Sequence, residues 1–232
     1  MKKNKIEKII IFILMNIFIM SNALSQQIVT KSKLIIQHPD MTLYLQKDTN
    51  TMVSVHNLTY DNYLKIGTII RKDLGDPWFD DTYKGKFKEK YYKKNNFDLG
   101  HLTPFKETSY SKEVATKSFS SYNQSPQDSE FNRTSWKGIE KNILDSIGKY
   151  KTNSYIITGV IYNNDKPNYL TNSRIKIPIY YYKILFVSDK RYYWLGDNTT
   201  GSVNPVKETT LEELNKLFKD NKMDLKITSN IK

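Results

Sequence analysis

The most informative segment of the chain is Asp98-Leu99-Gly100-His101-Leu102-Thr103-Pro104, in which a histidine follows a glycine inside a short turn. Gly100 lets the backbone bend and approach a neighbouring segment closely, and Pro104 stiffens the exit from the turn. We expect Asp98 to hydrogen-bond nearby and to bias the orientation or tautomer of the His101 ring. A neutral imidazole with a pKa of about 6.5 is a suitable general base at neutral pH. Taken alone, the motif is equally compatible with a histidine that only packs in a turn.

A second segment, Phe131–Glu140, follows this histidine along the chain. Apolar residues at helical spacing predict a helix over Asn132–Lys149. Asn132 and Glu140 would then lie on one face, about 12 Å apart along the helix axis. That is too far for both to bind one ion directly, but the Asn132 amide oxygen could hold Mg²⁺ while the Glu140 carboxylate holds one of its waters. The alternative is ordinary, with Asn132 as a helix cap and Glu140 as a surface charge.

The chain has three histidines, and we expect the other two to be structural. His38 precedes a proline at the entrance of the domain. His56 alternates with apolar residues in a predicted strand. His101 is therefore the candidate base.

The first 25 residues have the layout of a secretory signal peptide. Four lysines precede an almost wholly apolar run over Ile9–Met20, and Ala23-Leu24-Ser25 offers small residues for cleavage. The run is too short and wrongly flanked for a good membrane span, and an uncleaved N-terminal anchor is the alternative. We expect a secreted or periplasmic protein without stable membrane association after cleavage. Residues 26–232 are expected to form a single domain with its own core.

The chain carries an excess of positive charge and no cysteine. Its formal net charge is +12, of which the predicted signal segment contributes +3. This surplus favours polyanions such as nucleic acid, anionic lipid or acidic glycans, although a lysine-rich composition is a competing explanation. Without cysteine, the fold uses neither disulfides nor thiolate metal sites. Asp76–Asn96 is expected to be a long surface loop, either a solvated excursion or a basic, tyrosine-rich lip for nucleic acid.

Apolar periodicity along the rest of the chain predicts an α+β fold with a mixed, mostly antiparallel central sheet flanked by helices. Thr59–Lys65 is expected to turn into a short strand or helix, and Gly67–Arg71 is β-rich. Thr210 and Glu213 form a capping-box pattern before an amphipathic closing helix. Strands are expected over Thr42–Gln46, Met52–Leu58, Tyr155–Tyr162, Ile175–Val187 and Tyr192–Leu195, the first two as a hairpin.

Several blocks in fixed order resemble the DNA/RNA non-specific endonuclease family, which includes secreted sugar-non-specific nucleases and mitochondrial endonuclease G. The resemblance covers roughly Met41–Asp197 and implies a ββα-metal core, also called a histidine–metal finger. The blocks are Asp98–Pro104, Tyr122-Asn123-Gln124-Ser125-Pro126-Gln127, Phe131-Asn132 with Trp136 and Glu140, Thr158–Tyr162, Ile177-Pro178 and Tyr182-Lys183.

The resemblance implies a role for each matching residue. His101 matches the general base, Asn132 the one direct protein ligand of the metal, and Glu140 the acid that orders a metal-bound water. Asn123 matches the asparagine of the family's Ser-Asn-Ile-Ser/Thr-Pro-Gln block, which supports the site. Arg71 lies where the family often has a phosphate-binding arginine. The implied cofactor is Mg²⁺, with Mn²⁺ as the alternative.

The chain departs from the family pattern at two positions. Leu99 stands where the family usually has arginine, and leucine can neither bind a phosphate nor pair with a carboxylate. Lys93, Lys94 or Arg133 could supply the missing charge from elsewhere. Some members have a second arginine one turn after the acid, where this chain has Leu144. We expect a working enzyme that is slower or has an altered preference.

The expected function is Mg²⁺-dependent hydrolysis of DNA and RNA by an exported endonuclease with little sequence specificity. Surrounding lysines would bind phosphates, which carry no sequence information. One alternative is a degenerate relative that binds nucleic acid without cutting it. Another is a toxin-like effector nuclease neutralised by an immunity protein. The sequence leaves the oligomeric state open.

Overall fold

The structure is a computed structural model of the 232-residue chain, and it describes residues 28–31, 34–46, 51–75, 96–202 and 205–228. The predicted signal segment, nearly all of the predicted 76–96 loop, and Lys93 and Lys94 lie outside the described residues. Within the described part, no helix is both long and apolar enough to cross a membrane.

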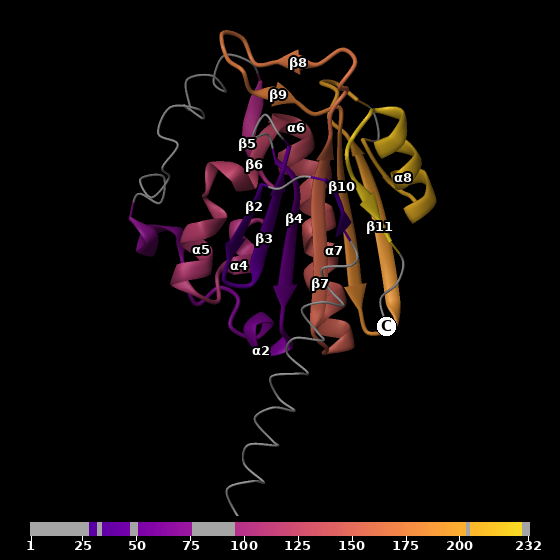
Figure 1. Ribbon diagram of the computed structural model, residues 1–232. Coiled ribbons are helices and arrows are strands. Elements are labelled where there is room, and N and C mark those ends of the chain that lie inside the picture. The colour runs from indigo at the N-terminus through magenta and orange to yellow at the C-terminus, as the bar shows by residue number, and fades with distance from the viewer. Residues whose placement is uncertain (1–27, 32–33, 47–50, 76–95, 203–204, 229–232) are drawn as a thin grey trace, which may run out of the picture.

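A seven-stranded sheet forms the centre of the molecule, and each pair of neighbouring strands in it is antiparallel (Figure 1). This confirms the α+β fold and the predicted hairpin, which consists of β3 and β4. In spatial order the strands are β12 (Val206–Glu208), β11 (Lys190–Asp197), β10 (Tyr180–Val187), β7 (Ser154–Ile161), β4 (Thr51–Leu58), β3 (Met41–Leu45) and β2 (Ile35–His38).

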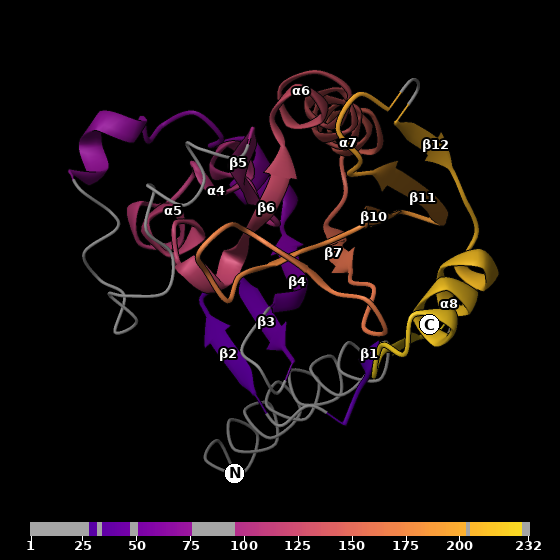
Figure 2. The same cartoon turned by 90° about the horizontal axis from the view of Figure 1, so that it is seen from above.

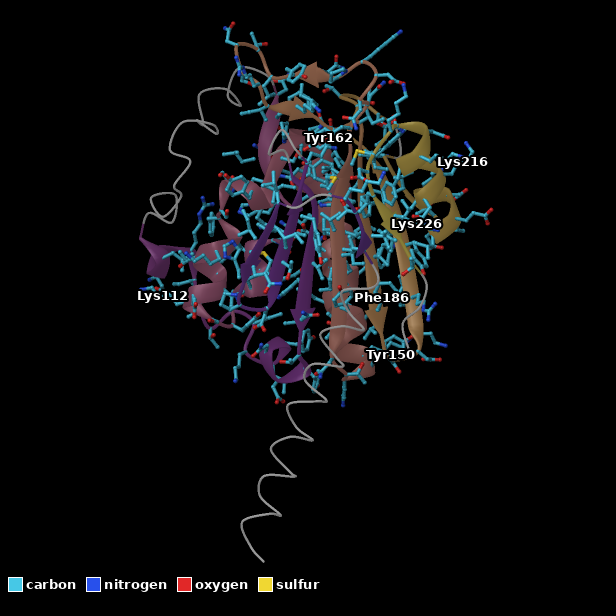
Figure 3. All side chains as sticks on the ribbon, in the orientation of Figure 1. Lys112, Tyr150, Tyr162, Phe186, Lys216 and Lys226 are labelled. Atoms are coloured by element: carbon cyan, nitrogen blue, oxygen red, sulfur yellow. The ribbon has the colours of Figure 1, made fainter. Side chains whose placement is uncertain are left out.

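Helices cover both faces of this sheet (Figure 2). On one face, α7 (Lys137–Tyr150) buries three isoleucines against β4, β7 and β10. On the other face, α8 (Leu211–Asp220) buries Leu214 and Phe218, and the Phe218 ring packs 5.2 Å from that of Tyr182. The predicted capping box is present, because the Thr210 hydroxyl accepts from the Glu213 amide. Lys112 on α5 (Lys112–Ser118) and Lys216 on α8 mark opposite flanks of the molecule (Figure 3).

A two-stranded antiparallel ribbon followed directly by a helix lies on the α7 side of the sheet. The ribbon pairs β5 (Phe97–His101) with β6 (Gln124–Asp128), and His101 lies opposite Gln124. The chain then enters α6 (Ser129–Phe131), a π-helical turn (Asn132–Trp136) and α7 without a break. Between the two strands lie α4 (Phe105–Thr108), α5 and a 3₁₀ turn (Ser121–Asn123). This strand–strand–helix order is that of the predicted ββα core.

The remaining elements are short. A β8–β9 arm lies above β5 and β6 in Figure 1, and β1 pairs with β13 near the two ends of the described chain. Their bounds, with those of the remaining helices, are β8 (Asn168–Tyr169), β9 (Lys176–Ile177), β1 (Ile28–Val29), β13 (Lys226–Ile227), α2 (Tyr60–Tyr63) and a 3₁₀ turn (Arg71–Leu74).

Three sequence predictions about these elements are wrong. Gly67–Arg71 forms no strand, because Gly67 has a positive φ of 90° and the chain enters the 3₁₀ turn at Arg71. The predicted strand Ile175–Val187 is interrupted at Pro178, which separates β9 from β10. The helix predicted from Asn132 begins at Ser129, since the Asp128 side chain caps the amides of Glu130 and Phe131.

Candidate active site

His101 is half-buried at the end of β5, where its ring meets three neighbours. The edge of the ring packs against Phe119, with 5.0 Å between ring centroids. The Arg71 guanidinium lies over the same phenyl ring, 5.1 Å from its centroid. The third neighbour is the Gln124 amide, whose Nε2 is 3.4 Å from His101 Nε2. The structure therefore brings the predicted phosphate-binding arginine close to the predicted base.

This environment keeps the imidazole neutral. Burial, and secondarily the positive charge of Arg71, lower the pKa of His101 from 6.5 to about 4. At neutral pH the ring therefore carries one proton and one lone pair. That is the form a general base requires.

The turn around His101 depends on the glycine before it and on Asn123. A Cβ placed on Gly100 would lie only 2.5 Å from the Cβ of Gln127 in β6, so only glycine fits there. The Asn123 side chain accepts from the Thr103 amide at 3.0 Å, and its nitrogen donates to the carbonyls of Thr103 and Ser118, each at 2.7 Å. Asn123 thus holds the segment after His101, as the family block implies.

Asp98 connects β5 to the helix that carries Asn132. Its carboxylate accepts from the Asn132 amide nitrogen at 2.9 Å, and from Arg133 Nε at 2.9 Å and Nη2 at 2.6 Å. The prediction that Asp98 orients His101 is wrong, because its hydrogen bonds go to the helix and the histidine ring meets Gln124 instead. The bond from Asn132 also fixes the amide, so that its oxygen points away from Asp98. The alternative role of Asn132 as the helix cap is likewise wrong, since Asp128 caps the helix.

The two positions that depart from the family pattern have apolar partners here. Leu99 packs with Phe97 and Ile177 against the buried pair Leu170 and Ile175 of the β8–β9 arm. Leu144 is buried in the layer between α7 and the sheet. Arg133 donates two hydrogen bonds to the Asp98 carboxylate. A cation is thus present at the carboxylate although β5 itself carries leucine.

Glu140 lies on α7 in a surrounding that opposes its ionisation. Burial raises the pKa of Glu140, Lys183 opposes this shift, Glu107 adds to it, and Lys137 and Lys106 oppose it more weakly, so that the net pKa is about 7. The alternative of an ordinary surface charge therefore does not describe this residue. Its carboxylate is poised to change protonation state near neutral pH.

A buried ion pair beneath the site was not predicted from the sequence. Lys183 of β10 lies 3.6 Å from the Glu107 carboxylate, and both side chains are almost fully buried. Lys183 Nζ also donates to the carbonyl of Leu102 at 3.3 Å, directly after His101, and to the Thr158 hydroxyl at 2.9 Å. Burial raises the pKa of Glu107, but Lys183 and His56 together outweigh it and hold this pKa below its usual value. The lysine inside the otherwise apolar sequence of β10 is the feature from which a buried ion pair could have been predicted.

The other histidines lie outside this site. His56 is fully buried in β4, where its Nδ1 is 3.5 Å from the Glu107 carboxylate and its Nε2 is 3.3 Å from the Tyr110 hydroxyl. His38 ends β2 at the edge of the sheet. These positions agree with structural roles.

The donor set suits a hard divalent cation that keeps most of its water. Among the described residues, no group of three or more His, Cys, Asp or Glu could enclose a metal ion. Asn132 offers one neutral amide oxygen and Glu140 one carboxylate. Mg²⁺ is bound in this manner, through few protein oxygens together with waters and substrate phosphates.

Comparisons with known proteins agree with this geometry. Residues 21–227 match the family model described as DNA/RNA non-specific endonuclease. The solved structure of an EndoG/EndoGI complex, described as showing the mechanism of EndoG inhibition, has the same fold. Its TM-score is 0.62 at 17% identity, over 78% of this chain and 82% of that chain. A comparison with curated proteins finds no match. Since the family model covers most of the sequence, the chain belongs to the DNA/RNA non-specific endonuclease family and is a nuclease that hydrolyses phosphodiester bonds.

Proposed function

We propose that the protein is an exported, Mg²⁺-dependent endonuclease that cuts DNA and RNA with little sequence specificity. The observation that carries the proposal is the ββα module itself. One short strand holds both the neutral His101 and the Asp98 carboxylate that fixes Asn132. Metal-dependent hydrolysis of a phosphodiester requires a general base and an oxygen ligand for a divalent cation, and this module carries both.

His101 would take a proton from the attacking water. Its ring is neutral, and Phe119 and Gln124 restrict its orientation. The resulting hydroxide attacks phosphorus in line with the leaving 3′ oxygen, which leaves a phosphate on the 5′ end. Arg71, next to the ring, would bind a phosphate oxygen and disfavour protonation of the base before the reaction.

Asn132 would hold the cation through its amide oxygen, and Glu140 would order one of the waters of that cation. When bound, a divalent cation supplies charge stabilisation at the phosphoryl group and the leaving oxygen. Mg²⁺ and Mn²⁺ both suit these oxygen donors. Asp98 and Arg133 support the arrangement by fixing the Asn132 amide.

Cations around the site account for binding without base recognition. Lys106 and Lys137 are exposed, and their charges reach Glu140. Arg71 lies near His101, over the Phe119 ring that packs against the histidine. Positive side chains of this kind contact phosphates, and phosphate contacts carry no sequence information. We therefore expect similar affinity for DNA and RNA of different sequence.

The test is cleavage of circular DNA, linear DNA and RNA by the purified protein, with Mg²⁺, Mn²⁺ or EDTA. His101→Ala should abolish cleavage and retain binding, while His38→Ala, at the end of edge strand β2, should cut at the wild-type rate. Cleavage by His101→Ala at the wild-type rate would show that another group is the base. A wild-type protein that retards DNA on a gel but leaves it intact would be a degenerate binder.

A further inference from the structure

Gln124 is the side chain that directly faces the nitrogen of the catalytic ring. It lies opposite His101 in the β5–β6 register, and its side chain is almost fully buried, with 2% exposure. Its amide nitrogen is 3.4 Å from His101 Nε2. In the family block that this segment resembles, the position belongs to isoleucine. An isoleucine at this position could not make this contact.

The chemistry of a neutral imidazole limits what this contact can be. The ring has one N–H and one lone pair, and a base needs the lone pair to face water. Within the described residues, Nδ1 of His101 makes no hydrogen bond, and it is not among the buried side-chain atoms that lack a partner, so it is exposed. Nδ1 is thus the nitrogen that water can reach. The proton must then be on Nε2, which faces Gln124.

Only one end of the Gln124 amide can accept that proton. If the NH₂ group faces Nε2, it donates to the ring, the ring proton is forced onto Nδ1, and no lone pair faces water. A half-turn of the amide puts Oε1 at the same place, where it accepts the Nε2–H. In the structure Gln124 Oε1 is buried and accepts no hydrogen bond from the described residues. The half-turn of the amide therefore breaks no hydrogen bond to this oxygen.

We propose that Gln124 is the positioning residue of His101. Its side-chain oxygen accepts the Nε2–H of the ring and leaves Nδ1 unprotonated towards the attacking water. Arg71 acts differently, because its charge disfavours the doubly protonated ring but does not select which nitrogen carries the single proton. The importance of this tautomer for catalysis rests on the proposed function, whereas the tautomer itself can be measured without substrate.

The experiment is ¹⁵N NMR of the full chain with labelled histidine at neutral pH, without nucleic acid. Chemical shifts of Nδ1 and Nε2 report which nitrogen is protonated, and a His101→Gln sample assigns the signals. We expect the Nε2–H form in the wild type and a mixture of forms in Gln124→Leu. Gln124→Glu keeps an oxygen acceptor and should keep the Nε2–H form. Gln37→Leu, on the exposed face of β2, is the matched control and should change nothing.

Kinetics complete the test. Gln124→Leu should lower kcat on the order of tenfold to a hundredfold while KM stays unchanged, because orientation of a general base affects the chemical step. Circular dichroism and the urea midpoint show whether the variant is folded. If Gln124→Leu is unfolded, the Gln124→Glu spectrum and the wild-type tautomer still decide the question. An Nδ1–H ring in the wild type, or an unchanged tautomer in folded Gln124→Leu, overturns the inference. An inactive wild type with the Nε2–H form contradicts the proposed function alone.

Discussion

Replacing Lys183 by methionine tests how the buried charges beneath the site hold it together. The Lys183 and Glu107 side chains are 0% and 1% exposed, and their charged atoms are 3.6 Å apart. Removing one partner of such a pair leaves an uncompensated buried charge, which typically costs about 3–5 kcal/mol. Methionine retains the apolar length of lysine, so the packing next to Trp136 is largely preserved. The loss therefore reports the charge and its hydrogen bonds to Leu102 and Thr158.

A second substitution separates the charge from the packing. In Lys183→Met/Glu107→Gln neither buried charge remains, so most of the lost stability should return. Lys216→Met is the control, because its pair with Asp220 is exposed on α8 and such pairs contribute at most about 0.5 kcal/mol. Each free energy of unfolding comes from urea titration followed by tryptophan fluorescence.

The double variant decides between two explanations. If Lys183→Met loses less than about 1 kcal/mol, the ion pair does not hold the site in the manner described. If the double variant is as unstable as the single one, the effect of Lys183 comes from packing and hydrogen bonds rather than from the charge left on Glu107.

Three further perturbations test the geometry of the site. Gly100→Ala brings a Cβ to 2.5 Å from that of Gln127, so it should destabilise the protein by about 3 kcal/mol in urea and lower kcat. A loss below about 0.5 kcal/mol would contradict the close approach of β5 and β6. Leu99→Arg should destabilise the protein and leave cleavage no faster, because Leu99 packs against the β8–β9 arm and Arg133 already pairs with Asp98. An increase in kcat/KM would show that the leucine is a defect. Activity should rise with pH as Glu140 ionises through its pKa of about 7, since His101 is already neutral above about 4. An unchanged acid limb in Glu140→Gln would assign that limb to another group.

The order of elements could be predicted from the sequence because local patterns determine it. Alternating apolar residues marked β3 and β4, and the apolar positions Ile139, Ile143 and Ile147 marked the buried face of α7. The predictions failed where a single distant contact decides. Ile69 and Ile70 favour a strand locally, but the Ile69 amide finds its acceptor at the Ser109 carbonyl instead of in a strand ladder.

The site shows the same division between local and long-range information. His101, Asn132 and Glu140 could be named from motif and spacing, which a sequence records directly. The side chains around these residues could not be predicted from the sequence. They are Gln124, Glu107 and Lys183, which reach the site only after β6, α4 and β10 have packed together. Asp98 was expected to act on His101, but its partner is the helix that follows β6. Motif residues are therefore predictable, and the side chains that tune them depend on tertiary structure.

We propose that His101 and Asn132 face one cation site, and binding of paramagnetic Mn²⁺ would report on this arrangement. We would titrate Mn²⁺ into the protein with ¹⁵N-labelled histidine and follow the imidazole signals. We expect the His101 signal to broaden at low Mn²⁺ concentration, before that of His38, and Asn132→Ala to abolish this selective broadening. Equal broadening of the two histidines, or selective broadening that persists in Asn132→Ala, would show that the two residues do not share a cation site.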